Sequence, residues 1–242
     1  MPQIQITEFD ASQFDSSSPL LLSEGEVHLW RAFTRTFESR GKELEALLSR
    51  EEAGRFERFY FPKDRTRFVV AHGILRIIIG RYLNISPNLV DFRSSPNGKP
   101  ELRGHFDPES FSFSLSHSHN LVVFAFSKFR SLGVDVEHIR HMPDLHEIAD
   151  NYFHPNEIAA LQSFPLDKRK KAFFDCWTRK EAFVKATGEG LCRPLDSFFV
   201  SIGSEKEGGI ISVDGYGIRT ANWNLLSFRP AHGYAGAVAF ET

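Results

Sequence analysis

The chain has 242 residues, of which 41% are hydrophobic and 25% are charged, and its formal net charge is −2. This is the composition of an ordinary globular protein, and the charge excludes the strongly basic surface of a nucleic-acid-binding protein. The longest apolar stretch, residues 68–79, is interrupted by His72 and Arg76 and is shorter than the roughly 20 residues of a membrane-spanning helix. We therefore expect a cytoplasmic protein without nucleic-acid or membrane partners, long enough for two small domains.

The first half of the chain is predicted to run from a strand through helices to further strands. Residues 20–30 indicate the first strand, and apolar residues at helical spacing predict two amphipathic helices, around residues 44–48 and from a cap at Asp64 to Tyr82. Asn97, Gly98 and two prolines predict a turn. Alternating Phe or Leu and Ser over residues 111–116 then predict a half-buried strand, followed by a turn and a strand at residues 121–127.

The second half is predicted to repeat the order of helices followed by strands. Pro155 suits the first turn of a helix, and Gly188 suits the end of another at residues 168–187. A meander is predicted for the strands that follow, at residues 197–202, 209–213, 223–228 and 234–240. Two cysteines in so long a chain are expected to be free and buried.

Two observations leave an internal duplication open. Both halves run from helix to strand, and the residues that close the first half, 121–127, resemble those that close the second. With a boundary near residues 127–132, the halves are 1–129 and 130–242. We expect an α+β fold in which a pseudo-twofold pair of similar halves encloses a cleft, the natural place for a ligand.

Three acidic residues are the most informative chemical feature. Asp135 and Glu137 lie two residues apart on a predicted strand, so both side chains point to the same face. On the predicted helix, Trp177, Glu181 and Lys185 follow one another at intervals of four and share one face. Three carboxylates from a strand and a helix suit one magnesium ion. Each of these two patterns alone also occurs on ordinary protein surfaces. For the neighbouring Lys180, the sequence does not decide between a side chain in solvent and a covered one.

Several polar and basic residues are candidates for binding phosphate. His117 follows Ser116 at a predicted strand-to-turn junction, and Lys99 lies in the predicted turn. A cluster of arginines on the helices of the first half also suits phosphate: Arg55, Arg58, Arg65, Arg67 and Arg76. Each of these residues is equally well explained as an ordinary turn or surface residue, so none of them decides by itself.

Four segments in a fixed order carry a family resemblance: NGKP, FSLSHS, LGVDVE and WTRKEAFVKATGEGL. Together they resemble the phosphopantetheinyl transferases, and the length is similar to the larger single-chain kind that primes surfactin synthetase. The resemblance covers roughly residues 48–195. It implies two similar α+β halves with coenzyme A in the cleft between them. It also implies magnesium-dependent transfer of 4′-phosphopantetheine from coenzyme A to a serine of an apo acyl or peptidyl carrier protein, with release of 3′,5′-ADP and with Mn²⁺ as the alternative ion.

The resemblance assigns roles to individual residues. The metal ligands would be Asp135, Glu137 and Glu181. The residues that bind coenzyme A would be Lys99, Ser116 and His117 at its phosphates, Lys185 at the pyrophosphate and Arg55 at the 3′-phosphate. We expect Glu181 to accept the serine proton while His117 and Lys185 hold the phosphoryl oxygens. Two positions depart from the family pattern, Ser114 in place of asparagine and Phe68 in place of threonine, and both affect the contacts to the nucleotide.

The resemblance also predicts where a carrier protein would bind. An acidic helix of the carrier would dock on Tyr152, Phe153 and Lys168–Lys171, and a chain that already supplies both halves is expected to be a monomer. No residue selects a particular carrier. A binding module for coenzyme A explains much of the sequence but gives no reason for the third acid, and a magnesium-dependent phosphatase or nuclease would also use clustered acids.

Overall fold

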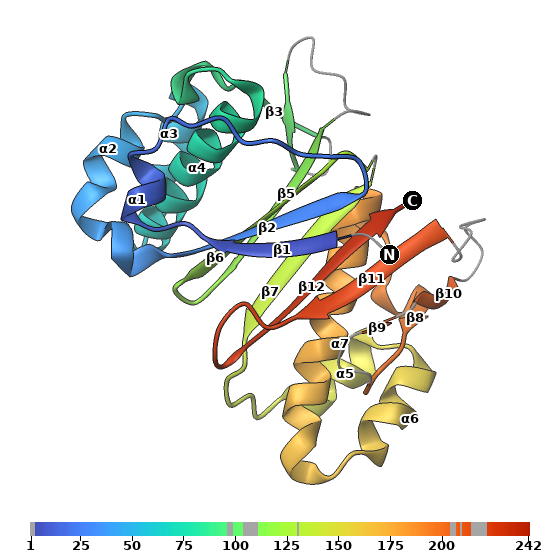
Figure 1. Ribbon diagram of the computed structural model, residues 1–242. Coiled ribbons are helices and arrows are strands. Elements are labelled where there is room, and N and C mark those ends of the chain that lie inside the picture. Colours follow the sequence, from blue (N-terminus) through green and yellow to red (C-terminus); the bar gives the residue numbers. More distant parts are fainter. Residues whose placement is uncertain are drawn as a thin grey trace.

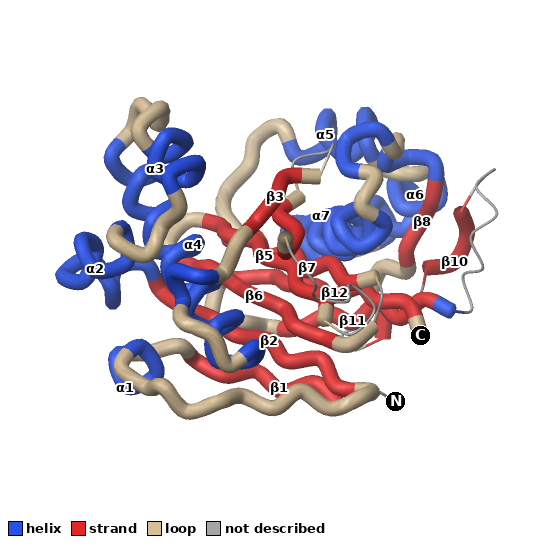
Figure 2. Tube along the Cα trace, turned by 90° about the horizontal axis from the view of Figure 1, so that it is seen from above, coloured by secondary structure: helices blue, strands red, loops and turns tan. Residues whose placement is uncertain are grey.

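The computed structural model describes residues 3–95, 99–103, 111–129, 131–203, 207–208, 210–213 and 222–242. It has a mixed α+β fold, as predicted (Figure 1). Two four-stranded sheets have the strand orders β1-β2-β6-β5 and β7-β12-β11-β9, and two further pairs, β3-β4 and β8-β10, lie beside them (Figure 2). The turn predicted at Asn97 and Gly98 lies outside the described residues.

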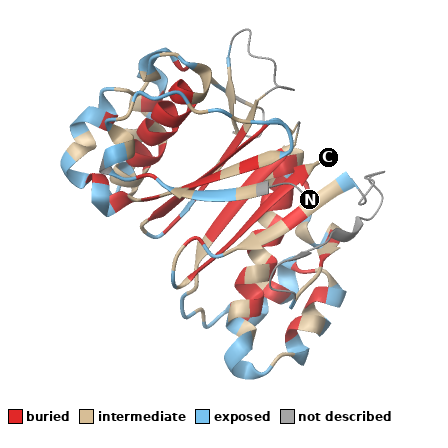
Figure 3. Ribbon diagram, in the orientation of Figure 1, coloured by how far each residue is buried: buried red, intermediate tan, exposed pale blue. Residues whose placement is uncertain are grey.

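Apolar side chains arrange these elements in four layers. One core lies between α4 and the first sheet, and a second lies between α7 and the second sheet. A third core joins the opposite faces of the two sheets, where Val27 and Val123 meet Val134 and Val238. The strands β6, β7 and β12 are therefore buried along most of their length, whereas β1 and β11 are mostly half-buried or exposed (Figure 3). Near-continuous apolar runs such as residues 121–126 are the consequence of this burial.

The first half begins with a strand that the sequence did not reveal, β1. Residues 20–25 precede the next strand instead of belonging to it, and α4 begins at Pro62 rather than at Asp64 because proline is well suited to the first helical position. The strand predicted to end at residue 116 continues to Ser118. The elements are β1 (Gln3–Glu8), α1 (Ala11–Phe14), β2 (Glu26–Phe33), η1 (Thr34–Arg40), α2 (Gly41–Glu45), α3 (Arg50–Phe56), α4 (Pro62–Leu83), η2 (Pro87–Leu89), β3 (Phe92–Ser94), β4 (Pro100–Leu102), β5 (Ser112–Ser118) and β6 (Leu121–Ser127).

The second half confirms both helix signals. Pro155 is the first residue of α6, and Gly188 ends α7 in the left-handed conformation, with φ 73°. The predicted meander is wrong, because β8 and β10 form a sheet of their own while β12 pairs with the distant β7. The elements are β7 (Leu132–His138), α5 (Leu145–Tyr152), α6 (Pro155–Ser163), α7 (Leu166–Thr187), η3 (Gly190–Cys192), η4 (Leu195–Ser197), β8 (Phe198–Val200), β9 (Glu207–Gly208), β10 (Ile210–Val213), β11 (Trp223–Phe228) and β12 (Tyr234–Glu241).

The two halves repeat one order of elements. A first strand, β2 or β7, leads through a short helix, α3 or α6, to a helix of 22 residues, α4 or α7. An antiparallel hairpin follows, β5-β6 or β11-β12, and its second strand pairs antiparallel with the first strand of its own half. The sheet orders β2-β6-β5 and β7-β12-β11 are thus equivalent.

Each half also contains a buried acid that connects its short helix to its long helix. The carboxylate of Glu52 in the capping box of α3 accepts hydrogen bonds from Arg76 Nε at 2.9 Å and Nη2 at 2.5 Å. The carboxylate of Glu157 in the capping box of α6 accepts a hydrogen bond from Lys180 Nζ at 2.7 Å. Arg76 and Lys180 occupy the same position of their helices, fourteen residues after the first residue. Arg76 is therefore a structural residue and not part of a phosphate-binding cluster, and Lys180 is covered rather than solvated.

The described residues also test the expectations about membrane-spanning helices and about the two cysteines. None of the helices there combines the length and the apolar character that a bilayer crossing requires. Both cysteines are free, as expected, but only Cys176 is buried, because Cys192 lies on the exposed turn after α7.

Replacing Glu52 with Gln tests the buried pair in the first half. Burial acts to raise the pKa of Glu52, but hydrogen bonds from His72, the Ser49 backbone and Arg76 outweigh it and lower the pKa from 4.5 to about 2. The ionised carboxylate therefore stabilises the fold above pH 4.5, and this contribution is lost as the pH falls toward 2. We expect E52Q to lose about 3 kcal/mol of unfolding free energy at pH 7 and progressively less below pH 4.5.

Chemical denaturation of both proteins across this pH range measures the difference, with the exposed Glu38→Gln as the control. A loss of stability that is equal at pH 7 and at pH 2.5 would contradict the electrostatic explanation.

Candidate active site

Three serines join the two sheets. Ser114, Ser116 and Ser118 alternate along β5, so their side chains share one face, and this face is buried against β7. Their Oγ atoms accept hydrogen bonds from the backbone N–H groups of β7 at Val134, Val136 and His138, over 3.0, 3.4 and 3.0 Å. We call these three residues the serine seam. The strand predicted to be half-buried therefore has its serines on a buried face, because hydroxyl groups satisfy the backbone of a strand from the other sheet.

The serine seam also binds the two acids of β7. Asp135 is 4% exposed, and its Oδ1 accepts hydrogen bonds from Ser116 Oγ at 2.8 Å and from Lys185 Nζ at 2.6 Å. Glu137 Oε2 accepts a hydrogen bond from Ser118 Oγ at 2.6 Å. Both carboxylates are therefore fixed in orientation by residues from outside their own strand.

A glycine allows the catalytic helix candidate, α7, to lie directly on β7. At Gly133 a Cβ atom would lie 2.1 Å from the carbonyl oxygen of Ala182 and 2.4 Å from the backbone nitrogen of Ala186. No side chain fits between the two backbones. This close approach brings Glu181 and Lys185 on α7 to the same level as Asp135 on β7, which explains why the LGVDVE segment needs glycine before its acids.

The structure brings the three predicted acids into one pocket. A cavity of about 360 Å³ is lined by Asp135, Glu137 and Glu181, together with Ser116, His117, Trp177 and Lys185. The helix contributes its expected face, since Trp177, Glu181 and Lys185 all line this cavity. Among the described residues no hydrogen bond reaches the Glu181 carboxylate, which leaves its oxygens accessible in the pocket.

The residues of this pocket fit a divalent cation. Asp135 Oδ2 is buried and has no hydrogen-bond partner in the described part of the chain, and such an orphan oxygen is unfavourable unless a cation or water satisfies it. Carboxylate oxygens are the ligands that Mg²⁺ prefers. In the described residues no three acidic, histidine or cysteine side chains already lie close enough together to hold one metal ion, and Lys185 Nζ lies 2.6 Å from Asp135 Oδ1. Binding a metal therefore requires these side chains to rearrange.

Two glutamates of the pocket, Glu137 and Glu181, have pKa values above their ordinary range. Loss of contact with water raises the pKa of Glu181, and the neighbouring Asp135 and Glu137 raise it further. Burial also raises the pKa of Glu137, although the Ser118 hydroxyl opposes this. Desolvation by the surrounding protein lowers the pKa of His117, and the positive charge of Arg67 lowers it further, although the residue remains exposed to solvent. The pocket thus holds acids whose negative charges repel one another, which favours a cationic ligand.

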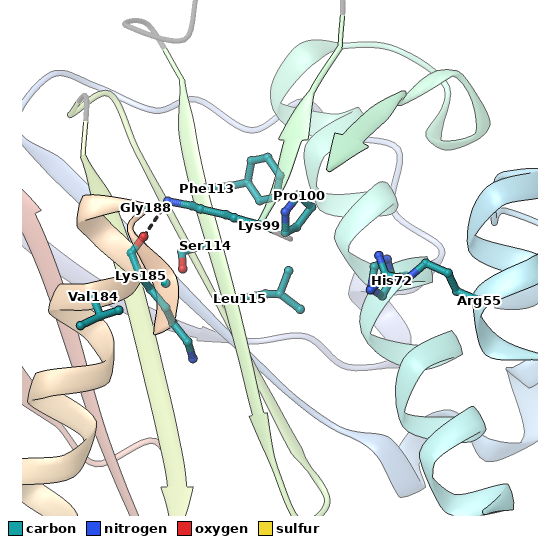
Figure 4. Close-up of a pocket in the computed structure, with 11 residues that line it drawn as sticks. Arg55, His72, Lys99, Pro100, Phe113, Ser114, Leu115, Val184, Lys185 and Gly188 are labelled. Atoms are coloured by element: carbon teal, nitrogen blue, oxygen red, sulfur yellow. Dashed lines mark hydrogen bonds between the residues drawn. The ribbon is translucent and has the colours of Figure 1, made fainter. Parts of the chain in front are cut away.

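A second pocket, of about 280 Å³, adjoins the first through Lys185. It lies between the two halves, with Arg55 and His72 on one side and Lys99 and Lys185 on the other (Figure 4). Lys99 Nζ donates hydrogen bonds to the carbonyl oxygens of Leu132 at 3.1 Å and Lys185 at 2.9 Å, and burial lowers the pKa of its ammonium group. Four nitrogen-bearing side chains around one cavity suit an anion with several charges.

Comparisons with known proteins identify the family. Residues 29–129 match the N-terminal 4′-phosphopantetheinyl transferase family, and residues 131–239 match the 4′-phosphopantetheinyl transferase superfamily. The 4′-phosphopantetheinyl transferase HetI of Nostoc sp. is 39% identical over 221 residues, which are 91% of this chain and 90% of HetI. The chain belongs to the 4′-phosphopantetheinyl transferase superfamily and is an enzyme.

Two other relatives are more distant from this transferase. The transferase Sfp of Bacillus subtilis strain 168 is 31% identical over 157 residues, which are 65% of this chain and 67% of Sfp. The transferase gsp of Aneurinibacillus migulanus is 34% identical over 157 residues, which are 65% of this chain and 63% of gsp.

Some arginines of the transferase that were candidates for phosphate binding instead donate hydrogen bonds to backbone carbonyl groups of the protein. Arg65 donates hydrogen bonds to the carbonyl oxygens of Phe59 and Glu57, and Arg67 donates to that of His119. Of the arginine cluster, only Arg55 lines either of the two pockets described above.

Two side chains of the transferase lie in places that were not expected from the sequence. Phe153, expected at a docking surface, is 2% exposed and packs on Phe173, because it closes the core under α7. His72 was noted only as an interruption of an apolar stretch, yet it lines the second pocket. Its position gave a signal, since His72 lies four residues from both Phe68 and Arg76, on one face of α4.

Replacing Gly133 with Ala tests the close approach of β7 and α7. The added methyl group would overlap the backbone of α7, so we expect a loss of about 3 kcal/mol or more in the free energy of unfolding. The matched control is Gly54→Ala in α3, where nothing lies within 4 Å of the added Cβ. Urea denaturation of both variants measures the difference, and wild-type stability of G133A would show that the helix does not need this contact.

Proposed function

We propose that this transferase moves the 4′-phosphopantetheine group of coenzyme A to a serine hydroxyl of an apo acyl or peptidyl carrier protein, with Mg²⁺ or, alternatively, Mn²⁺, and releases 3′,5′-ADP. One observation carries the proposal: a pocket lined by three acids continues, through Lys185, into a pocket lined by cations. A donor with several phosphates suits the second pocket, and a metal-assisted transfer suits the first. The relatives' names agree with the group that is transferred.

The proposal places coenzyme A in a cleft between two pseudo-twofold halves, 1–129 and 130–242. The repeated order of elements and the two equivalent buried pairs, Glu52 with Arg76 and Glu157 with Lys180, support this arrangement. Both pockets have walls from both halves, since Ser116 and His117 come from β5 whereas Glu181 and Lys185 come from α7. A single chain therefore supplies every residue of the site, and we propose that it acts as a monomer in the cytoplasm.

The cationic residues would bind the phosphates of the donor. Lys185 lies where the two pockets meet, so it is the natural partner of the pyrophosphate, with His117 and Ser116 beside it. Lys99 and Arg55 line the second pocket and would bind the nucleotide phosphates. Ser114 Oγ already accepts a hydrogen bond from the backbone of Val134, so its hydroxyl is partly used by the fold.

Asp135, Glu137 and Glu181 would hold the metal ion, which would supply positive charge next to the pyrophosphate. The remaining chemistry belongs to side chains of the protein. Glu181 would accept the proton of the attacking serine, because its carboxylate is accessible in the pocket and its raised pKa makes it a stronger base than an ordinary glutamate. His117 and Lys185 would steady the oxygens of the phosphoryl group as negative charge moves to 3′,5′-ADP.

The carrier would approach from the side of α5 and α7. A third pocket, of about 420 Å³, is lined by Tyr152 and Asn151 of α5 and shares Glu181 and Lys185 with the first. Tyr152 is half exposed, and two residues of the Lys168–Lys171 run, Lys168 and Lys170, are exposed near the start of α7. An acidic carrier helix suits this combination of an aromatic ring and positive charge.

Mass spectrometry of apo carrier proteins tests the proposed function directly. We expect a carrier incubated with the enzyme, coenzyme A and Mg²⁺ to gain the mass of phosphopantetheine, and excess EDTA to abolish this gain because the acids then lack their cation. Equal modification with and without EDTA would contradict the role of the metal. Absence of modification for every apo carrier tested would contradict the transfer itself.

Replacing Glu181 with Gln tests the assignment of the base. The amide cannot accept the serine proton at neutral pH, so we expect kcat to fall by about 100-fold or more while the fold is kept. The control is Glu45→Gln, an exposed residue of α2. Carrier loading by E181Q at the rate of the wild type, with circular dichroism unchanged, would show that another group takes the proton.

A further inference from the structure

Arg55 and His72 are aligned by an aromatic ring at the nucleotide side of the second pocket. The rings of Phe68 and His72 are stacked, with their centroids 4.0 Å apart and an angle of 21° between the planes. The guanidinium carbon of Arg55 lies 5.7 Å from the centroid of the Phe68 ring. In Figure 4, Arg55 and His72 lie next to each other, opposite Lys99 and Lys185. Phe68 itself is 7% exposed and does not line the pocket, so it contacts the two nitrogen-bearing side chains without occupying the pocket.

Glu52 fixes the orientation of His72. The Nδ1 atom of His72 lies 2.8 Å from Oε1 of Glu52, while Oε2 of the same carboxylate accepts two hydrogen bonds from Arg76. Because Nδ1–H donates to Glu52, Nε2 is the ring nitrogen left for a ligand in the pocket. A charged imidazole held in this way donates Nε2–H to an anionic oxygen. The side chain of His72 is 12% exposed, so little water competes with such a ligand.

We propose that His72, together with Arg55, binds the 3′-phosphate of coenzyme A, with Phe68 and Glu52 as positioning residues. The inference rests on the proposed function, because it adds His72 to Arg55, which the family resemblance already places at the 3′-phosphate of that donor. It also explains why the chain has Phe68 where the family resemblance leads one to expect threonine. A hydroxyl contact is replaced by an aromatic support for two side chains that bind phosphate. His72 is thus a specificity-determining residue that separates coenzyme A from 3′-dephospho-coenzyme A.

Binding of two nucleotides tests this inference without the transfer reaction. Calorimetry with 3′,5′-ADP and with 5′-AMP isolates the contribution of the 3′-phosphate, since the two ligands differ only there. We expect the wild type to bind 3′,5′-ADP more tightly and His72→Gln to lose about tenfold of this preference, as for one charge-assisted hydrogen bond. His72→Arg restores a cation and is expected to recover most of the preference. The control is His232→Gln, because His232 is exposed on the turn before β12.

Kinetics of carrier loading provide the second measurement. For H72Q we expect KM for coenzyme A to rise about tenfold, with kcat and the kinetics of 3′-dephospho-coenzyme A unchanged. A wild-type enzyme without preference for 3′,5′-ADP would overturn the inference. An H72Q variant that keeps the preference, or that binds both nucleotides more weakly by the same factor, would also overturn it. A wild type that prefers 3′,5′-ADP but loads no carrier would instead refute the proposed function and leave this phosphate site intact.

Discussion

The hydrogen bonds between the hydroxyls of β5 and the backbone of β7 determine how the candidate site residues of β5, β7 and α7 lie relative to one another. These strands belong to different sheets, and the serine seam joins them by side chains. Ser116 connects the two halves most directly, because its Oγ donates to Asp135 and accepts from Lys185. Since α7 lies on β7 through Gly133, the position of this seam also sets the distance from His117 on β5 to Glu181 on α7. The fold and the proposed chemistry thus share the same few contacts.

The two halves have equivalent frameworks but different functional residues. Ile77 follows Arg76 in α4 as Glu181 follows Lys180 in α7, and Ile77 is buried in the core whereas Glu181 lines the acidic pocket. The first half instead provides residues that suit an anion, Arg55 and His72, on the opposite wall. In the proposed function, Arg55 and His72 of the first half would contact one part of the donor, while Lys185 of the second half would contact its pyrophosphate next to the three acids. The buried pairs, Glu52 with Arg76 and Glu157 with Lys180, hold both long helices in place.

The sequence was informative wherever a pattern is local. Alternation in β7 and the spacing of four residues in α7 identified Asp135, Glu137, Glu181 and Lys185, and the structure brings all four to one pocket. The two long helices and the end of α7 at Gly188 were predicted for the same reason.

Features that depend on contacts between distant segments could not be predicted. The serines of β5 look like a solvated face until β7 is placed against them, and Lys180 looks like a surface residue until Glu157, 23 residues away, is found beside it. The strand β1 is defined by its parallel pairing with β2, and the pairing of β12 with β7 spans almost half the chain. The role proposed for His72 depends on Glu52 and Arg55, which lie on another helix.

A crystal structure of the enzyme with coenzyme A and Mg²⁺ tests the central claim most directly. The account predicts the ion between Asp135, Glu137 and Glu181, with the pyrophosphate next to Lys185 and with Lys185 released from Asp135. Coenzyme A bound away from the junction of β5, β7 and α7, or an ion held without the three acids, would contradict it.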